Sequence, residues 1–230
     1  MGPCSAPVLS KAMQTLRIPI FPLNVVLFPG MLLPLHIFEP RYQEMVRACL
    51  DRDGRFGVCL IRSGVEVGGP ADPYPVGTTC RILQVTPLGE GKLDLSTVGH
   101  QRFRIVRLYH ERPYLEAEVE LLDDVGGELG DLPARLRDAV EQYVLRMLPS
   151  ASPEAVTLPD DPLLLSHLAG AVLQISPEER QEVLEIDSLP ERLRRQLELF
   201  AEEMTRLERA EPERLVARPL HPDPSKFSPN

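Results

Sequence analysis

The residues of this sequence that could do chemistry are few, and the most suggestive pair is His36 and Glu39. A histidine beside a carboxylate can act as a general acid and base. The alternative is structural: His36 lies half-buried beside the start of a helix, while Glu39 caps helix amides or pairs with Arg41. Because no nucleophile stands in a recognisable turn motif, the structural interpretation is favoured, and no catalytic residue is predicted.

The cysteines are the other reactive side chains. They are Cys4, Cys49, Cys59 and Cys80. They do not form a Cys-x-x-Cys pair, and no histidine stands at zinc-ligand spacing from them. Free cysteine behaves as a small hydrophobe. The sequence therefore predicts reduced, buried thiols, no metal site and no cofactor.

A row of carboxylates offers a third possibility. Glu116, Glu118 and Glu120 alternate with apolar residues between Tyr114 and Leu121. They could form an acidic site. However, a period of two is typical of a strand with one face in the core and the other in water. We therefore expect a strand whose glutamates are solvated.

Composition limits the classes of partner. The 230 residues are 43% hydrophobic, with 25 Lys and Arg against 34 Asp and Glu, which gives a net charge of −9. This balance disfavours general binding to nucleic acid and to anionic membranes, because both depend on neutralising phosphates. No signal peptide and no apolar run of membrane-spanning length is visible. A cytoplasmic protein is expected.

The elements that must position these residues begin with an apolar stretch from Ile18 to Tyr42 that is interrupted by five prolines. Because proline is poorly tolerated inside strands and helices, this stretch predicts short strand pieces with tight corners. Pro29-Gly30 predicts a turn. Glu39-Pro40 predicts a helix start, with the helix running to Arg52 and burying its apolar face.

The remaining chain predicts strands and then helices. Strands are expected over 56–61, 79–86, 93–97 and 103–108, with a long loop over Ser63–Gly77 and a bulge at Gly99. Helices are expected over 132–148 and 161–175. Ser176 and Glu179 form a capping box, which Ser188 and Glu191 repeat. The last helix carries a seam near heptad spacing, expected to pack on the other helices, with packing on a partner chain as the alternative: Leu189, Leu193, Leu197, Phe200, Met204 and Leu207.

These elements predict an α+β fold with a strand-rich half and a helical half. The division is a loose leader at 1–14, a β-rich subdomain at 15–124, a helical subdomain at 125–210 and a disordered tail at 211–230.

The opening stretch also carries a family resemblance. The pattern P-I-F-P-L-N-V-V-L-F-P-G-M-L-L-P-L-H-I-F-E-P-R-Y resembles the start of the Lon protease amino-terminal domain, also called the Lon substrate-binding domain. The resemblance runs from Leu16 to Glu208. It implies a compact PUA-like β-barrel with one helix, followed by a C-terminal helical bundle. The family-signature positions are Pro22, Asn24, Pro29, Gly30, Pro34, His36, Phe38, Glu39, Arg41 and Tyr42.

A complete Lon protease adds an ATPase module and a Ser-Lys protease module, and the sequence gives no sign of either. The nearest fragment to a phosphate-binding loop is Gly89–Lys92, which has the wrong spacing and is expected in a hairpin turn. The lysines are Lys11, Lys92 and Lys226, and none is placed to activate a serine as a buried base. The resemblance thus implies a stand-alone, non-enzymatic member.

The function that the resemblance implies is binding of unfolded or damaged polypeptides in protein quality control. An exposed apolar patch would serve this purpose. Candidate contributors are Phe28, Pro29 and Met31 at the Pro-Gly corner, together with the Ser63–Gly77 loop. The alternative for Phe28 and Met31 is that they belong to the core.

Two other functions stay open at this point. One is an adaptor or regulator that binds a protease or another single protein through its helical half. The other is a PUA-like binder of RNA or a small ligand. Net charge argues against RNA, although Arg102, Arg104 and Arg107 could form a local basic patch.

Overall fold

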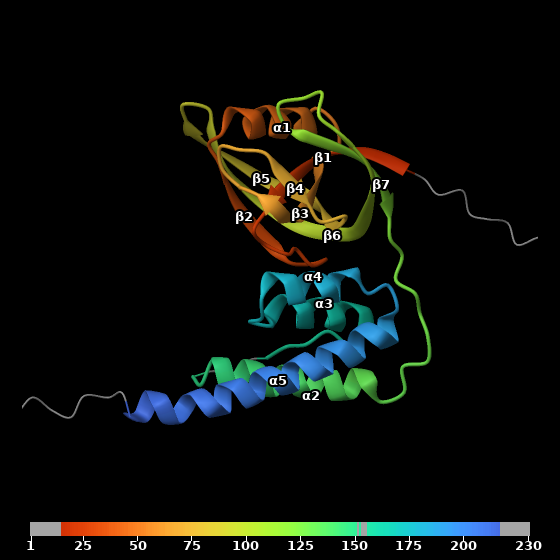
Figure 1. The fold of residues 1–230 in the computed structure, drawn as a ribbon, viewed down its shortest axis with the longest axis vertical. Helices are drawn as coiled ribbons and strands as arrows, with labels where there is room; N and C mark the ends of the chain where they lie inside the picture. Colours follow the sequence, from red (N-terminus) through yellow and green to blue (C-terminus); the bar gives the residue numbers. More distant parts are fainter. Residues whose placement is uncertain (1–14, 151, 153–155, 217–230) are drawn as a thin grey trace, which may run out of the picture.

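The computed structural model describes residues 15–150, 152 and 156–216. Figure 1 shows a β-barrel stacked on a helical half. The predicted leader at 1–14, and residues 217–230 of the predicted tail at 211–230, lie outside the described residues. Over the described ranges, no helix is long and apolar enough to cross a membrane.

The barrel is a closed ring of five strands. The ring consists of β1 (Thr15–Leu23), β7 (Leu115–Leu121), β6 (Lys92–Tyr109), β5 (Val76–Gly89) and β3 (Arg55–Gly64), in that order. Neighbouring strands are antiparallel, except that β1 also pairs in parallel with β3, and this pairing closes the ring. Because the ring is closed, none of its five strands has an unpaired edge.

Two shorter strands are attached to this ring. β2 (Leu32–Ile37) pairs with the first half of β6, and β4 (Ala71–Pro73) pairs with the end of β3. The predicted loop Ser63–Gly77 is therefore interrupted by strand residues at both ends and at β4. β3 runs to Gly64, β5 begins at Val76, and only a short turn over 65–70 connects β3 to β4. The barrel-like sheet agrees with the expectation from the resemblance; its relation to PUA folds stays a prediction.

Several local predictions for the strands can be compared with the structure. The strands expected at 93–97 and 103–108 form one strand, β6. Its register shifts beside Gly99, because Thr78 faces Arg102 while Cys80 faces Gly99, so the predicted bulge is confirmed. On β7 the apolar residues face the core as expected. However, Glu116 is buried and bonded to Arg17 at 2.8 Å, so the prediction of a solvated Glu116 is wrong.

The helix α1 (Pro40–Leu50) covers one end of the barrel. Its buried residues are those that the helical period predicted: Tyr42, Met45, Val46 and Cys49. They pack into a cluster with barrel residues from β1, β2, β3 and β5.

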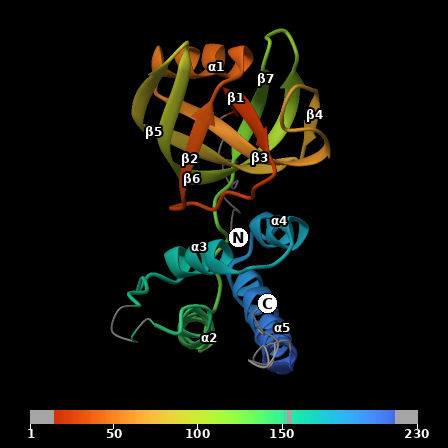
Figure 2. The ribbon, with the colours of Figure 1, turned by 90° about the vertical axis from the view of Figure 1, so that its left-hand side faces the viewer.

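The helical half contains α2 (Leu132–Met147), α3 (Pro162–Val172), α4 (Pro177–Glu185) and α5 (Leu189–Val216). Figures 1 and 2 both place α3 and α4 against the barrel, with α2 and α5 beyond them. The seam of α5 packs in a cluster shared by the helices, as predicted. α5 continues to Val216, past the predicted boundary at 210, so residues 211–216 of the predicted tail are helical.

The helix starts follow the capping chemistry in the sequence. Asp161 accepts bonds from the N–H groups of Leu163 and Leu164, and Ser176 forms the predicted capping box with Glu179. At Ser188 the main chain instead forms a β-bridge with Val125, which joins the start of α5 to the connection between the two halves.

Candidate functional site

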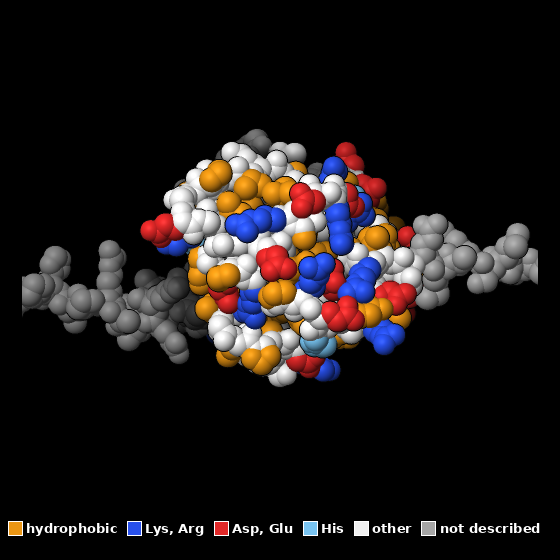
Figure 3. All heavy atoms as spheres, turned by 90° about the horizontal axis from the view of Figure 1, so that it is seen from above, with side chains coloured by type: hydrophobic (Ala, Val, Ile, Leu, Met, Phe, Trp, Pro, Cys, Tyr) orange, Lys and Arg blue, Asp and Glu red, His pale blue; other side chains and the backbone are white. Residues whose placement is uncertain are grey.

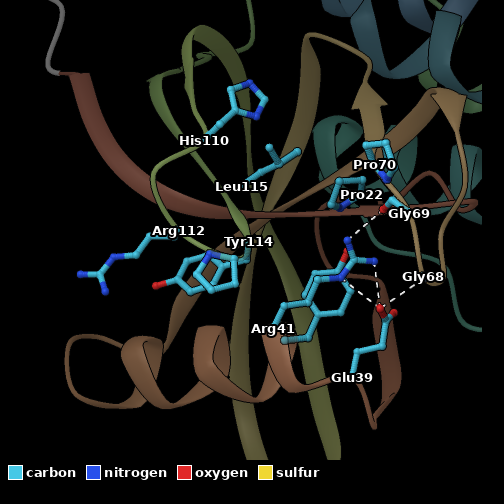
Figure 4. Close-up of a pocket in the computed structure, with 13 residues that line it drawn as sticks. Pro22, Glu39, Arg41, Gly68, Gly69, Pro70, His110, Arg112, Tyr114 and Leu115 are labelled. Carbon is cyan, nitrogen blue, oxygen red and sulfur yellow. Dashed lines mark hydrogen bonds and ion pairs between the residues drawn. The ribbon is translucent and has the colours of Figure 1, made fainter.

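Arg41 organises the end of the barrel beside α1. Its guanidinium donates to the Glu39 carboxylate at 3.0 Å, to the Gly69 carbonyl at 2.9 Å and to the Glu66 carbonyl at 3.3 Å. The Gly68 N–H also donates to Glu39 at 3.3 Å. The signature residues Glu39 and Arg41 therefore hold the turn between β3 and β4 against the start of α1, as Figure 4 shows.

Two adjoining pockets lie beside this anchored turn. The larger one, about 430 Å³, lies between the turn, α1 and the β6–β7 connection, where His110 and Tyr114 line it (Figure 4). The smaller one, about 280 Å³, lies between the turn, β1 and β2. Both pockets are lined by Glu39 and Tyr42, so we treat them as one groove, named here the signature groove.

The rim of the signature groove is apolar and exposed. Phe38, Val65 and Val67 are 46%, 53% and 56% exposed. Phe38 and Val67 line the smaller pocket, and Val65 lies two residues before Val67 in the same turn. Figure 3 looks down on the α1 end of the barrel and shows apolar side chains in small groups among charged ones. Phe38, Val65 and Val67 thus offer exposed apolar area that another chain could remove from water.

His36 and Glu39 do not bond to each other. His36 Nδ1 lies 2.7 Å from a carboxylate oxygen of Asp94, its ring stacks on Phe38, and its side chain is about half exposed. Glu39 bonds to Arg41 and Gly68. The predicted Glu39–Arg41 pair is thus confirmed, and the groups needed for an acid–base pair are occupied elsewhere.

The corner at 28–31 does not form an exposed patch. Phe28 is fully buried in the cluster of the helical half, so its candidate place on a binding surface is wrong and the alternative, that it belongs to the core, is confirmed. A Cβ atom on Gly170 of α3 would lie 2.4 Å from the Phe28 ring, which shows how closely α3 covers this corner. Met31 is half-buried against the barrel core, and Pro29 lines a separate pocket where barrel and helices meet.

The three arginines proposed as a basic patch are also placed differently. Arg102 is only 1% exposed and donates to the Leu184 carbonyl at 2.8 Å and to Asp187 at 3.1 Å. Arg104 pairs with Asp187 at 3.4 Å. Arg107 lies over the Tyr109 ring. The RNA hypothesis therefore loses Arg102, because its charge is used to join the barrel to the helices.

Arg102 belongs to a buried ionic cluster, named here the junction cluster, that sequence reasoning missed. Asp124 accepts from Arg102 at 3.0 Å and from Arg192 at 2.7 Å, and His167 Nε2 lies 3.9 Å from its other oxygen. Burial, and then the Arg192 charge, lower the pKa of His167 to about 4. The residues of the junction cluster come from β6, α3, α5 and the connection after β7, so no local sequence pattern could have indicated this cluster.

Three of the four thiols match the expectation of buried cysteines, and Cys4 lies outside the described residues. Cys49, Cys59 and Cys80 are free and buried. Burial raises the pKa of Cys49 to about 12, raises that of Cys80 to about 11, and raises that of Cys59 as well. Such thiols stay protonated at neutral pH and are poor nucleophiles. Among the described residues, no group of three or more His, Cys, Asp or Glu side chains could hold a metal ion.

Comparisons with known proteins agree with this geometry. The model of the ATP-dependent protease La (LON) substrate-binding domain matches residues 17–202. Lon protease 2 of Myxococcus xanthus is 34% identical over 191 residues, covering 80% of this chain and 23% of the relative. Lon protease of Anaeromyxobacter dehalogenans is 34% identical over 211 residues, covering 87% of this chain and 24% of the relative. The chain therefore spans about a quarter of the length of these relatives.

Solved structures show the same fold. The crystal structure of a Lon N-terminal domain protein from Xanthomonas campestris superposes with a TM-score of 0.63 at 29% identity, covering 79% of this chain and 97% of that one. The N-terminal domain of a Mycobacterium avium complex Lon protease superposes with a TM-score of 0.60 at 18% identity, covering 80% of this chain and 98% of that one. At this identity the similarity supports the fold alone. Since the family model covers most of the residues from β1 to α5, this chain belongs to the Lon substrate-binding domain family.

Proposed function

We propose that this chain is a cytoplasmic, non-catalytic module that binds unfolded or damaged polypeptides for protein quality control. The observation that carries the proposal is the apolar rim of Phe38, Val65 and Val67 over the signature groove. The family's description as a substrate-binding domain supports a polypeptide ligand. The buried thiols, and the occupied His36 and Glu39, support the absence of a catalytic centre here.

The rim is suited to unfolded chains for a physical reason. Exposed apolar side chains gain about 25 cal/mol for each Å² that a ligand removes from water. Folded proteins rarely expose large contiguous apolar patches that could supply this contact, whereas unfolded chains expose apolar segments. Because Arg41 fixes the turn that carries Val65 and Val67, little conformational entropy is lost when the rim is covered.

The test is a crosslinking titration with reduced, alkylated lysozyme and with native lysozyme. We expect the unfolded form to crosslink preferentially. A variant combining Phe38→Ser, Val65→Ser and Val67→Ser should lose at least about tenfold in affinity, because apolar contact area is removed at each position.

The matched control is Leu83→Ser with Val106→Ser. These side chains are 59% and 55% exposed and lie outside the groove. Their replacement should leave affinity unchanged. Equal crosslinking of native and unfolded lysozyme by the unaltered chain would end the proposal.

A second candidate, an adaptor for a single protein partner, is favoured by Met147 and Leu148 at the end of α2. They are 42% and 56% exposed in the helical half. Affinity capture that returns one dominant protein, and that Met147→Ser with Leu148→Ser abolishes, would support this role over general polypeptide binding.

A further inference from the structure

The strand β2 has one edge that no other described strand covers. It pairs with β6 over its whole length, with Leu33 facing Thr97 and Leu35 facing Leu95. The ring of β1, β7, β6, β5 and β3 does not include it. The main-chain groups on its other side are therefore free to pair with a further strand.

The structure identifies which main-chain groups face this free edge. The Met31 carbonyl accepts from the Gly99 N–H at 2.9 Å, and the Leu33 carbonyl accepts from the Thr97 hydroxyl at 2.6 Å, so both point toward β6. Because the direction of main-chain groups alternates along a strand, Leu35 and Ile37 also bond toward β6. The groups of Leu32, Pro34 and His36 then point away from it.

Pro34 agrees with this assignment. Proline has no N–H and is tolerated in a sheet where the missing donor would face outward from an edge strand. Leu32 and His36 thus each offer an N–H and a carbonyl at the free edge, whereas Pro34 offers a carbonyl alone. A proline at this position also limits uncontrolled pairing of the edge with other strands.

The free edge runs beside the smaller pocket of the signature groove. Residues 34–38 line one side of that pocket, while Leu23 of β1 and Val67 of the β3–β4 turn line the other. Figure 2 shows β1 and β2 on the same side of the barrel. A chain lying along β2 would therefore place alternate side chains into the pocket between β2 and β1.

We propose that the occupant of this edge is an extended polypeptide segment that adds a strand to β2, with its main chain bonded to Leu32, Pro34 and His36. This proposal rests on the proposed function and gives its binding mode. Main-chain bonds are independent of sequence, which suits a module that must accept many unfolded chains, while the apolar rim selects for apolar side chains.

The charges of the groove select among such segments. The lining of the smaller pocket includes the carboxylates of Glu39 and Glu66 and no lysine or arginine. Arg41 offsets the charge of Glu39 at 3.0 Å, so Glu66 supplies the negative charge of the lining. Asp94 lies beside it, paired with His36 at the surface. A segment with basic residues next to its apolar ones would be attracted, and an acidic segment would be repelled.

The first experiment is amide hydrogen exchange, followed by NMR, on the whole chain with and without reduced, alkylated lysozyme, which is basic and unfolded. The amides of Leu32 and His36 should become protected at least about fivefold on binding. The amides of Leu33 and Leu35, already bonded to β6, should change much less and act as internal controls.

The second experiment compares substitutions that differ in one N–H group. Leu32→Pro and His36→Pro remove an outward donor, whereas Leu32→Ala and His36→Ala keep it. Each proline variant should bind unfolded lysozyme about fivefold more weakly than its alanine counterpart. Reduced, alkylated lactalbumin, which is acidic, should bind the unaltered chain more weakly than lysozyme does.

The outcomes separate the two proposals. If the unaltered chain does not bind unfolded lysozyme, the proposed function fails. If it binds, but Leu32 and His36 gain no protection, the edge is not the site and polypeptide binding still stands. Protection with a period of two along β2 establishes strand addition, and this result requires no variant to fold.

Discussion

At the scale of single residues, function and stability depend on how buried and half-buried charges are arranged. Arg41 and Arg102 both donate to main-chain carbonyls as well as to a carboxylate. Arg41 fixes a turn at the rim of the groove, and Arg102 joins the barrel to α4. A lysine could not replace either one, because it lacks the planar fork that reaches several acceptors at once.

His167 predicts how stability depends on pH. Its pKa is lowered to about 4 by burial and by Arg192, with a further contribution from Arg102, while Asp124 and Asp161 oppose the shift. Since its ordinary pKa is 6.5, the unfolded chain takes up a proton at a higher pH than the folded chain does. This contribution is complete above pH 6.5 and is lost as the pH falls toward 4, by about 3 kcal/mol.

The measurement is urea unfolding at several pH values between 4 and 7.5, for the unaltered chain and for His167→Gln. The difference in unfolding free energy between the two should shrink as the pH falls, because groups that titrate in both chains cancel. A constant difference across this range would show that His167 is not kept neutral by the junction cluster.

At the scale of elements, features set by a few neighbouring residues could be predicted from the sequence, whereas features set by contacts between distant elements could not. The apolar face of α1, the capping box at Ser176 and the alternation of β7 were predictable, because helical and strand periods are properties of a few neighbouring residues. The burial of Phe28 and Arg102 was not, since their partners on α3 and α4 lie far along the chain.

The candidate site was predictable to a similar extent. The signature residues Glu39, Arg41 and Tyr42 and the region of the β3–β4 turn were named from sequence, and the structure brings them together in one groove. The sequence placed the candidate apolar patch at Phe28, Pro29 and Met31, because these residues lie at the predicted Pro-Gly corner. Only the position of α3 decides that Phe28 is covered while Phe38 is exposed.

The packing of the 28–31 corner against α3 can be tested by a double-mutant cycle. Gly170→Ala places a methyl group 2.4 Å from the Phe28 ring and should destabilise the fold by about 1–3 kcal/mol. Phe28→Leu should also destabilise it through lost contacts. In the double variant the smaller side chain makes room for the methyl group. Its loss in unfolding free energy should therefore be about 1 kcal/mol smaller than the sum of the two single losses.

The control for this cycle replaces Gly170→Ala by Gly126→Ala. A Cβ atom at Gly126 meets nothing within 4 Å, so its effect should add to that of Phe28→Leu. Chemical unfolding of the purified variants gives all the required free energies. Simple additivity in the Phe28 and Gly170 cycle would mean that the two do not share one packing site.

At the scale of the whole molecule, the barrel and the helical half are joined by contacts of two kinds. Phe28 contributes apolar packing from the barrel side, and the junction cluster contributes buried ion pairs. The connection from β7 to α2 adds the main-chain bridge between Val125 and Ser188. The groove is lined by Glu39, Arg41 and Tyr42 at the start of α1, and α1 lies at the end of the barrel away from α2–α5 (Figure 1). We therefore expect these contacts to set stability separately from ligand contact.

Asp124 is the common anion of this junction, and its removal should weaken the whole molecule. Arg102 and Arg192 are each 1% exposed and both donate to it. Asp124→Asn leaves buried guanidinium groups without their shared carboxylate, and breaking such a pair costs about 3–5 kcal/mol.

Asp160→Asn is the matched control, because its pair with Arg137 is at the surface and should contribute under about 1 kcal/mol. Urea unfolding should therefore separate the two variants by at least about 2 kcal/mol, whereas affinity for unfolded lysozyme, measured where both are folded, should match the unaltered chain. Equal stability of the two variants would mean that the junction is held by apolar packing alone.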